Sequence, residues 1–176
     1  MIYFVRHGES ETNVRKVFAG QKDNSPLTDA GRKQARNTAE EIIREGIKID
    51  KIYSSPLSRA YETAKIIASV LGFDAEDIIT EERIIEYDMG SLSETPNHKI
   101  TSAILVSAEN AEDPEKFRDR VCSCVKELSG FTENILLVSH AGVGRMLETV
   151  KEGVEAKLFY DLPPYKNASI TKIDWV

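Results

Sequence analysis

Short apolar runs alternate along this chain with longer segments whose apolar residues recur at helical spacing. The runs cover residues 2–5, 51–54, 78–80 and 135–138. Runs of this length are typical of buried strands, whereas the intervening segments are typical of amphipathic helices. Because strands that alternate with helices form parallel sheets covered on both faces, we predict an α/β fold. The expected architecture is a three-layer α/β/α sandwich with a mostly parallel central sheet.

Capping residues indicate where the helices begin and end. Thr28 is the predicted N-cap of a helix that ends at Gly46. Two further helices are expected from Ser55-Pro56 to Gly72 and from Asp113-Pro114 to Gly130. The other segments are expected to be an irregular stretch at 13–23, loop with some helix at 82–110, a helix at about 143–150 and a last strand at 169–175, at an edge of the sheet.

Length and charge narrow the possible classes of function. The 176 residues are expected to form a single domain, residues 1–176, with a substantial core. The net charge of −6 argues against nucleic acid or an anionic membrane surface as a partner. It does not argue against a small anionic substrate, because a pocket can be locally positive on an acidic protein.

Hydropathy and cysteine usage bear on the location of the protein. No apolar stretch is long enough to span a membrane, and the first residues lack the basic region of a signal peptide. Cys122 and Cys124 lie two positions apart in a predicted helix, where their side chains do not face each other. We therefore expect free thiols, and a reducing cytoplasm as the location.

Polar signatures directly follow three of the predicted strands. They are Arg6-His7-Gly8, Ser54-Ser55-Pro56-Leu57-Ser58-Arg59 and Ser139-His140-Ala141-Gly142. Neighbouring parallel strands end at one edge of a sheet, where open α/β sheets bind ligands. Two arginines and two histidines are thus expected to converge on one crevice. Because guanidinium groups match phosphate oxygens in a bidentate fork, a phosphoryl group is the natural occupant.

Each of these four residues is, by itself, also compatible with a purely structural role. His7 and His140 could each be a buried histidine with satisfied hydrogen bonds, and Arg59 could be a surface residue. A cation at the start of a helix interacts unfavourably with the helix dipole, so the position of Arg59 favours a binding role. The coincidence of all four residues at strand ends favours a shared site.

Several groups of residues, distributed over nearly the whole chain, together match the pattern of a known family. They are Arg6-His7-Gly8-Glu9-Ser10, Asn13, the positions Gly20, Asp23, Leu27, Thr28 and Gly31, then Ser55-Pro56-Leu57-Ser58-Arg59-Ala60 with Thr63-Ala64, Glu86-Tyr87-Asp88-Met89-Gly90, Ser139-His140-Ala141-Gly142-Val143 and Asn167-Ala168-Ser169-Ile170. In these motifs the chain resembles a small, phosphatase-type member of branch 1 of the histidine phosphatase superfamily, also called phosphoglycerate mutase-like.

The resemblance implies a phosphohistidine mechanism that needs neither a metal nor another cofactor. His7 would be the nucleophile that attacks phosphorus, in its neutral form and oriented by a hydrogen bond on its other ring nitrogen. Arg6, Arg59 and His140 would bind the phosphoryl oxygens and stabilise the transferring group. Asn13 would add a hydrogen bond to the phosphate.

A carboxylic acid is also implied, and the sequence offers more than one candidate. By the resemblance, Glu86 would protonate the leaving oxygen and then take a proton from the attacking water. Glu82 lies four residues earlier and is the alternative. The spacing from Glu86 to Gly90 favours Glu86.

The segment 91–113 departs from much of the family and is expected to be a short excursion that covers the pocket. Its possible cations are His98 and Lys99, whereas cofactor-dependent phosphoglycerate mutases are longer and carry additional basic residues there. The resemblance therefore favours a metal-independent phosphomonoesterase, monomeric or homodimeric, acting on a small phosphorylated metabolite. The alternatives are a cofactor-dependent phosphoglycerate mutase, which is an isomerase, and an inactive module that binds a phospho-ligand or a phosphoprotein.

Overall fold

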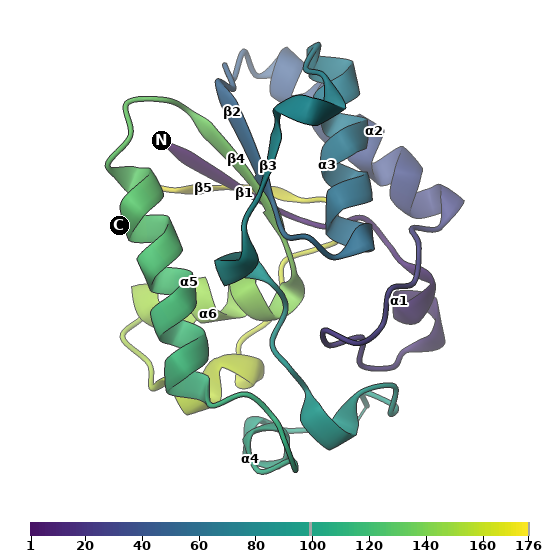
Figure 1. Ribbon diagram of the computed structural model, residues 1–176, viewed down its shortest axis with the longest axis vertical. Helices are drawn as coiled ribbons and strands as arrows, with labels where there is room; N and C mark the ends of the chain where they lie inside the picture. The colour runs from purple at the N-terminus through teal and green to yellow at the C-terminus, as the bar shows by residue number, and fades with distance from the viewer. Residues whose placement is uncertain (99, 176) are drawn as a thin grey trace.

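The computed structural model describes residues 1–98 and 100–175. The strands within these residues are β1 (Ile2–Arg6), β2 (Lys51–Ser54), β3 (Ile78–Thr80), β4 (Ile135–Ser139) and β5 (Ile170–Ile173). They form a single sheet with the order β3-β2-β4-β1-β5 (Figure 1). The first four strands run parallel to one another, and β5 pairs antiparallel with β1. The predicted mostly parallel sheet is confirmed, with the last strand at an edge.

The central strand β4 sets the register of the sheet. All of its residues are buried, which explains why its sequence is almost entirely apolar. β1 and β2 flank β4 so that Arg6 lies opposite Ser139 and Ser54 lies opposite Val138. The three polar signatures therefore leave the sheet at the same edge.

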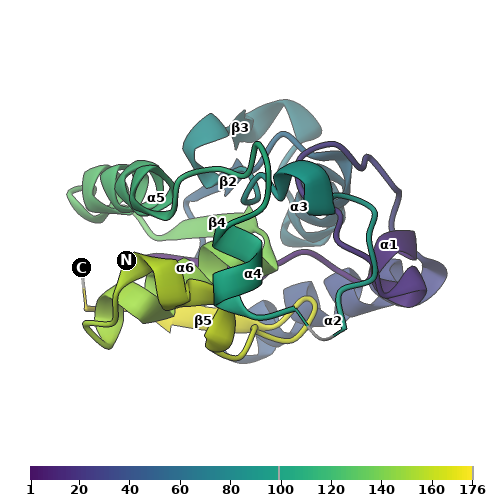
Figure 2. The same cartoon turned by 90° about the horizontal axis from the view of Figure 1, so that it is seen from below.

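Helices cover both faces of the sheet, as predicted. Their bounds are α1 (Glu11–Arg15), α2 (Asp29–Arg44), α3 (Ser58–Leu71), α4 (Ser102–Val106), α5 (Pro114–Ser129) and α6 (Ala141–Lys151), with short 3-10 helices η1 (Ala75–Asp77), η2 (Glu82–Ile84), η3 (Gly90–Leu92) and η4 (Ala156–Asp161). In Figure 1, α2 and α3 lie to the right of the strands, α5 lies to their left and α6 lies below them. Figure 2 shows α4 in front of the strands, and Figure 1 shows it below both α5 and α6.

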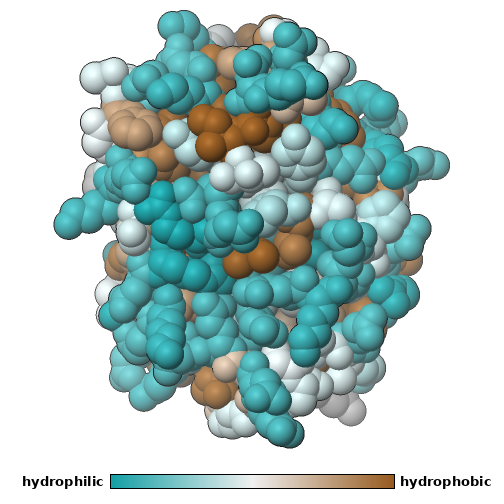
Figure 3. Space-filling view, in the orientation of Figure 1, coloured by the Kyte–Doolittle hydropathy of each residue, from teal (hydrophilic) through white to brown (hydrophobic). Residues whose placement is uncertain are grey.

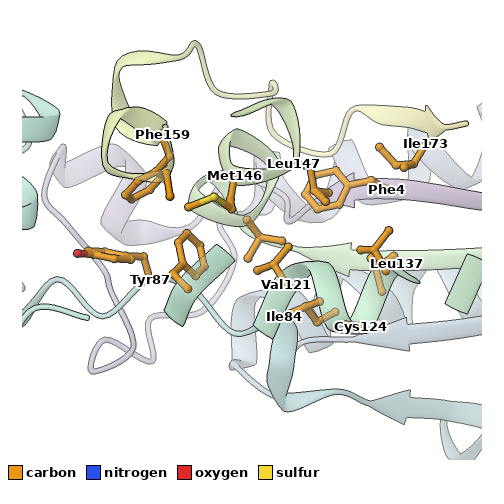
Figure 4. Close-up of a cluster of buried hydrophobic side chains, with 14 of the residues drawn as sticks. Phe4, Ile84, Tyr87, Val121, Cys124, Leu137, Met146, Leu147, Phe159 and Ile173 are labelled. Carbon is orange, nitrogen blue, oxygen red and sulfur yellow. The ribbon is translucent and has the colours of Figure 1, made fainter. Parts of the chain in front are cut away.

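The side chains of β4 alternate between two hydrophobic cores. Leu136 packs with α2 and α3, whereas Leu137 packs with α5 and α6. The second core continues beyond the strand ends to the ring of Tyr87, whose centroid lies 5.2 Å from that of Phe117 and 5.0 Å from that of Phe159 (Figure 4). This aromatic cluster anchors the segment that follows η2.

Two helix boundaries differ from those predicted. Helix α3 begins at Ser58 and not at Ser55, because the backbone N–H of Ser55 donates to the carbonyl of Val138 at 3.0 Å and continues the pairing of β2 with β4. Helix α6 begins at Ala141, two residues before the predicted start. The N-cap role of Thr28 is confirmed, since its side chain accepts from the backbone N–H of Gly31 at 3.0 Å.

Other differences concern short elements. The stretch 13–23 was expected to be irregular, but its first residues belong to α1. A capping box starts this helix: the Ser10 hydroxyl accepts from the N–H of Asn13, and the Asn13 side chain accepts from the N–H of Ser10. The last strand spans only Ile170–Ile173 of the expected 169–175. The segment 82–110 contains η2, η3 and α4, in agreement with loop and some helix.

The helices, one face of the surface and the two cysteines bear on expectations drawn from hydropathy and cysteine usage. Among the described residues, no helix has both the length and the apolar character that a membrane span requires. The face drawn in Figure 3 is mostly hydrophilic, with separate small apolar patches. Cys122 and Cys124 are free thiols, as expected, and burial raises the pKa of Cys124 to about 12.

Candidate active site

A pocket of about 150 Å³ opens at the carboxyl ends of β1, β2 and β4. This is the edge at which the polar signatures leave the sheet, and where ligands bind in open α/β folds. The residues that line the pocket are Arg6, His7, Asn13, Val17, Phe18, Ala19, Gly20, Arg59, Glu86, Met89, Asn97, Ala141, Gly142, Arg145, Tyr160 and Pro164.

His7 lies at the floor of this pocket and is almost fully buried. Its backbone N–H donates to the carbonyl of Ser139 at 2.9 Å, which continues the pairing of β1 with β4. The ring Nδ1 lies 2.7 Å from the carbonyl oxygen of Gly8. Because a carbonyl can only accept, Nδ1 carries the proton and Nε2 keeps its lone pair.

The surroundings of His7 also favour its neutral form. Burial lowers its pKa well below the ordinary histidine value, and the positive charges of Arg59 and Arg6 lower it further. A neutral imidazole with an oriented Nε2 lone pair has the properties of a nitrogen nucleophile.

Neither Arg59, which is buried, nor Arg6, which is half-buried, has a carboxylate at ion-pair distance among the described residues. Arg59 is 1% exposed, and its Nη1 and Nη2 atoms donate to the carbonyls of Asp23 and Gly20, both at 2.8 Å. Nη1 of Arg6 donates to the carbonyl of Tyr165 at 2.7 Å. Burial lowers the pKa of Arg6 to about 10, so the guanidinium stays charged at neutral pH. Two cations in one pocket, neither of them in a salt bridge among the described residues, favour an anionic ligand.

His140 lies beside His7 but deeper in the molecule. The two ring centroids are 5.3 Å apart, and His140 is fully buried and does not line the pocket surface. Its Nε2 lies 2.7 Å from the hydroxyl of Ser55, whereas Nδ1 has no partner among the described residues. Burial and the charge of Arg59 lower the pKa of His140 well below the ordinary value.

Glu86 lines the pocket, and Glu82 does not. Glu86 is 6% exposed; its Oε1 accepts from the N–H of Tyr87 at 2.8 Å, and its Oε2 from the N–H of Gly142 at 3.2 Å. Gly142 lies in the first turn of α6, where a negative charge interacts favourably with the helix dipole. Glu82 is an exposed residue of η2. Of the two candidate acids, the structure brings only Glu86 to His7.

Asn13 reaches the pocket from α1. Its Oδ1 atom accepts from the backbone N–H of Ser10 and from Nδ2 of Asn167, both at 3.1 Å. These bonds fix which end of the amide is the acceptor and leave the Nδ2 group to donate to a ligand. The structure therefore brings Arg6, His7, Asn13, Arg59 and Glu86 to one pocket, with His140 directly beneath it.

The described residues of the excursion contribute one side chain to the pocket. Of residues 91–98 and 100–113, only Asn97 lines it, and its backbone N–H donates to the carbonyl of Lys16 at 3.0 Å. His98 is exposed and lies outside the pocket. Lys99, the other cation expected there, lies outside the described residues.

Arg145 is a pocket residue that the sequence interpretation missed. Its guanidinium lies 4.0 Å from the centroid of the Tyr160 ring, and its buried Nε has no partner among the described residues. Arg145 follows Ala141 by four positions on α6, so both lie on the same helix face. That spacing was the available signal, because Ala141 belongs to the motif that contains His140.

The donor set of the site is not typical of a metal centre. Among residues 1–98 and 100–175, no group of three or more His, Cys, Asp or Glu side chains is arranged to hold a metal ion. The positive charge of the pocket comes from the guanidinium groups of Arg6, Arg59 and Arg145.

Comparison with known proteins places this pocket in a family. The family model of the histidine phosphatase superfamily (branch 1) matches residues 2–176. A 2,3-bisphosphoglycerate-dependent phosphoglycerate mutase of Thermoplasma acidophilum is 32% identical over 97% of this chain and 84% of the relative. A protein of Hydrogenobacter thermophilus with the provisional name phosphoserine phosphatase 2 is 32% identical over 98% of this chain and 88% of the relative.

The fold is also similar to that of solved structures. The structure of Bacillus stearothermophilus YhfR superposes with a TM-score of 0.81 and 24% identity, covering 99% of this chain and 91% of that one. This likeness confirms the α/β architecture. Because the family model spans nearly all of the chain and the relatives are 32% identical to it, the chain belongs to branch 1 of the histidine phosphatase superfamily.

Proposed function

We propose that this chain is a metal-independent phosphomonoesterase that works through a phosphohistidine intermediate on a small phosphorylated metabolite. The observation that carries the proposal is the state of His7. Its Nδ1–H donates to Gly8, its pKa is lowered by burial, and it shares the pocket with the buried Arg59 and the half-buried Arg6. This arrangement leaves an unprotonated Nε2 at the place where the charge would hold a phosphoryl group.

In the first step, the Nε2 lone pair of His7 forms a bond to phosphorus while the bond from phosphorus to the leaving oxygen breaks. Arg6 and Arg59 bind the phosphoryl oxygens, with a hydrogen bond from Asn13, and stabilise the charge that develops on them. The resemblance assigns His140 the same role, which requires the phosphoryl group to reach past the pocket lining to a ring that lies 5.3 Å from that of His7. Glu86, in its protonated form, transfers its proton to the leaving oxygen.

In the second step, water hydrolyses the phosphohistidine. Glu86, now a carboxylate, takes a proton from the water molecule as its oxygen attacks phosphorus. The bond between phosphorus and Nε2 breaks, which returns His7 to its neutral state and releases inorganic phosphate. The guanidinium groups supply the positive charge throughout, so that neither step is assigned to a metal ion.

A phosphoglycerate mutase is the second candidate, and Arg145 is the observation that favours it. A mutase must hold the carboxylate of its substrate as well as a phosphoryl group, and Arg145 provides a cation that could bind this carboxylate. The named relatives include both activities. Hydrolysis is favoured here because, among the described residues of the excursion, Asn97 alone lines the pocket, whereas a mutase has to exclude water while the intermediate is retained.

A panel of phosphorylated metabolites, assayed for phosphate release in the presence of a chelator, tests the proposal. We expect release of inorganic phosphate from at least one small phosphomonoester without added metal. Efficient interconversion of 2- and 3-phosphoglycerate, primed by bisphosphoglycerate and with negligible phosphate release, would instead establish the mutase. Binding of vanadate without any turnover would indicate a binding module.

A further inference from the structure

Arg120, on the buried side of α5, uses every N–H group of its side chain. Nε donates to Oε1 of Glu112 at 2.7 Å, and Nη2 donates to Oε2 of Glu112 at 2.9 Å. Nη1 donates to the carbonyls of Arg83 and Ile85, both at 2.8 Å, and Nη2 also donates to the carbonyl of Glu86 at 3.1 Å. A guanidinium has five N–H donors, so none is left over.

Glu112 holds the same segment from the other side of Glu86. Its Oε2 accepts from the N–H of Asp88 at 3.3 Å, and its backbone N–H donates to the carbonyl of Asp88 at 3.0 Å. The hydroxyl of Tyr87 donates to the carbonyl of Glu112. Arg120 and Glu112 therefore fix the backbone both before and after Glu86.

The position of the Glu86 carboxyl depends on that backbone. The residues from Ile85 to Met89 lie between η2 and η3, in neither a helix nor a strand. The donors to the carboxyl are the backbone N–H groups of Tyr87 and Gly142. A shift of the backbone at Glu86 would therefore move the carboxyl relative to Nε2 of His7.

We propose that Arg120, paired with Glu112, is the positioning residue that sets Glu86 at the distance required to protonate the leaving oxygen. The proposal rests on the proposed function, in which Glu86 is the acid. It assigns no contact with substrate to Arg120. Lysine cannot replace it, because a single ammonium group with three donors cannot bond three carbonyls and both oxygens of a carboxylate.

Leaving-group dependence separates positioning from a general structural role. An alkyl phosphate needs its leaving oxygen protonated, whereas the leaving oxygen of nitrophenyl phosphate needs little help. We would measure kcat/KM with both substrates, inhibition by vanadate and the Tm for Arg120→Lys, Arg120→Met and Glu112→Gln. Glu86→Gln is the reference, and Arg118→Met is the matched control.

Arg118 is a suitable control because it lies on the same helix and forms an ion pair with Glu115 at 2.6 Å, on the exposed side. We expect Arg118→Met to leave kcat/KM unchanged with both substrates. In the Arg120 and Glu112 variants, kcat/KM with the alkyl phosphate should fall by at least about tenfold, since misplacing a catalytic group lowers the rate by up to about a hundredfold. The kcat/KM for nitrophenyl phosphate and the inhibition by vanadate should change by less than about twofold, because both depend on His7 and the arginines, which are untouched.

An equal loss with both substrates would overturn the proposal and assign Arg120 to stability alone, a role consistent with its guanidinium lying 4.7 Å from the centroid of the Phe117 ring. If Arg120→Met does not fold, Arg120→Lys and Glu112→Gln decide the question. If Glu86→Gln itself lowers kcat/KM equally with both substrates, then Glu86 is not the acid and the proposed function is contradicted. If Glu86→Gln discriminates and the Arg120 variants do not, only the positioning role fails.

Discussion

The carboxyl of Glu86 occupies the space that a side chain at Gly142 would need. The backbone N–H of Gly142 donates to Oε2 of Glu86 at 3.2 Å, and a Cβ atom at position 142 would collide with Oε1. The first turn of α6 and the proposed acid are thus in direct contact. The absence of a side chain at this position is what lets the carboxyl reach the helix N-terminus.

Gly142→Ala should therefore displace the acid without touching the nucleophile. We expect kcat/KM with an alkyl phosphate to fall by about ten- to a hundredfold, because the carboxyl must move. Hydrolysis of nitrophenyl phosphate should fall much less. Gly130→Ala, at the C-cap of α5, is the control for a glycine substitution, since φ there is −73° and the nearest atom to a Cβ would be the carbonyl oxygen of Glu127 at 3.3 Å. An unchanged alkyl phosphatase activity in Gly142→Ala would contradict the assignment of Glu86.

Replacing the nucleophile His7 should lower kcat far more than replacing its neighbour His140. We expect His7→Ala to lower kcat by at least about 10⁴-fold, since no covalent intermediate can form. His140→Ala should cost about a hundredfold, the size of a lost stabilising hydrogen bond in the transition state. Steady-state kinetics with nitrophenyl phosphate measure both. Residual activity of a few per cent in His7→Ala would show that another group attacks phosphorus.

The arginines that line the pocket predict that anions stabilise the folded protein. Phosphate or vanadate at a hundred times its Kd should raise the free energy of unfolding by about 2.7 kcal/mol. For a chain of this size, that corresponds to a rise in Tm of roughly 5–10 °C. Arg59→Met should abolish the shift, whereas Arg36→Met, at an exposed position of α2, should preserve it. An equal shift in both variants would mean that the anion binds elsewhere.

The two buried histidines predict a loss of stability below neutral pH. Burial lowers the pKa of His7 and of His140 below the ordinary value, so that both stay neutral in the folded state while the unfolded chain takes up protons below about pH 6.5. Because the unfolded state then binds more protons, the free energy of unfolding falls with decreasing pH, by up to about 1.4 kcal/mol per pH unit for each histidine.

Urea unfolding between pH 7.5 and pH 5.5, about one unit on each side of the ordinary histidine pKa, measures this dependence. The stability should be constant at the upper end and should decline at the lower end. His140→Gln should reduce the slope by about half, because one of the two titrating groups is removed. An identical slope in the variant would show that other groups cause the acid sensitivity.

Much of the fold and of the site could be predicted from local sequence. His7 and His140 follow apolar runs that could only be buried strands, and the parallel register brought them together. The contact between Arg120 and the carbonyl of Glu86 could not be predicted, because it joins a helix to a segment without periodicity. Predicting Arg145 as a pocket residue required knowing which face of α6 points to the pocket, and that depends on where the helix begins. The start of α3 depended on a hydrogen bond between Ser55 and β4.

The place of β4 in the sheet has a consequence for folding. Ile2 pairs with Ile135, and Lys51 pairs with the same residue from the other side, so β1 and β2 are joined only through a strand from the last third of the chain. Contacts between residues so far apart in sequence form slowly, because a long loop must close first. A chain that emerges from the ribosome therefore cannot bring His7 to Arg59 before β4 has been synthesised, and cannot complete the sheet before β5 has followed. Phosphate should accordingly act as a ligand of the finished protein and not of any nascent fragment.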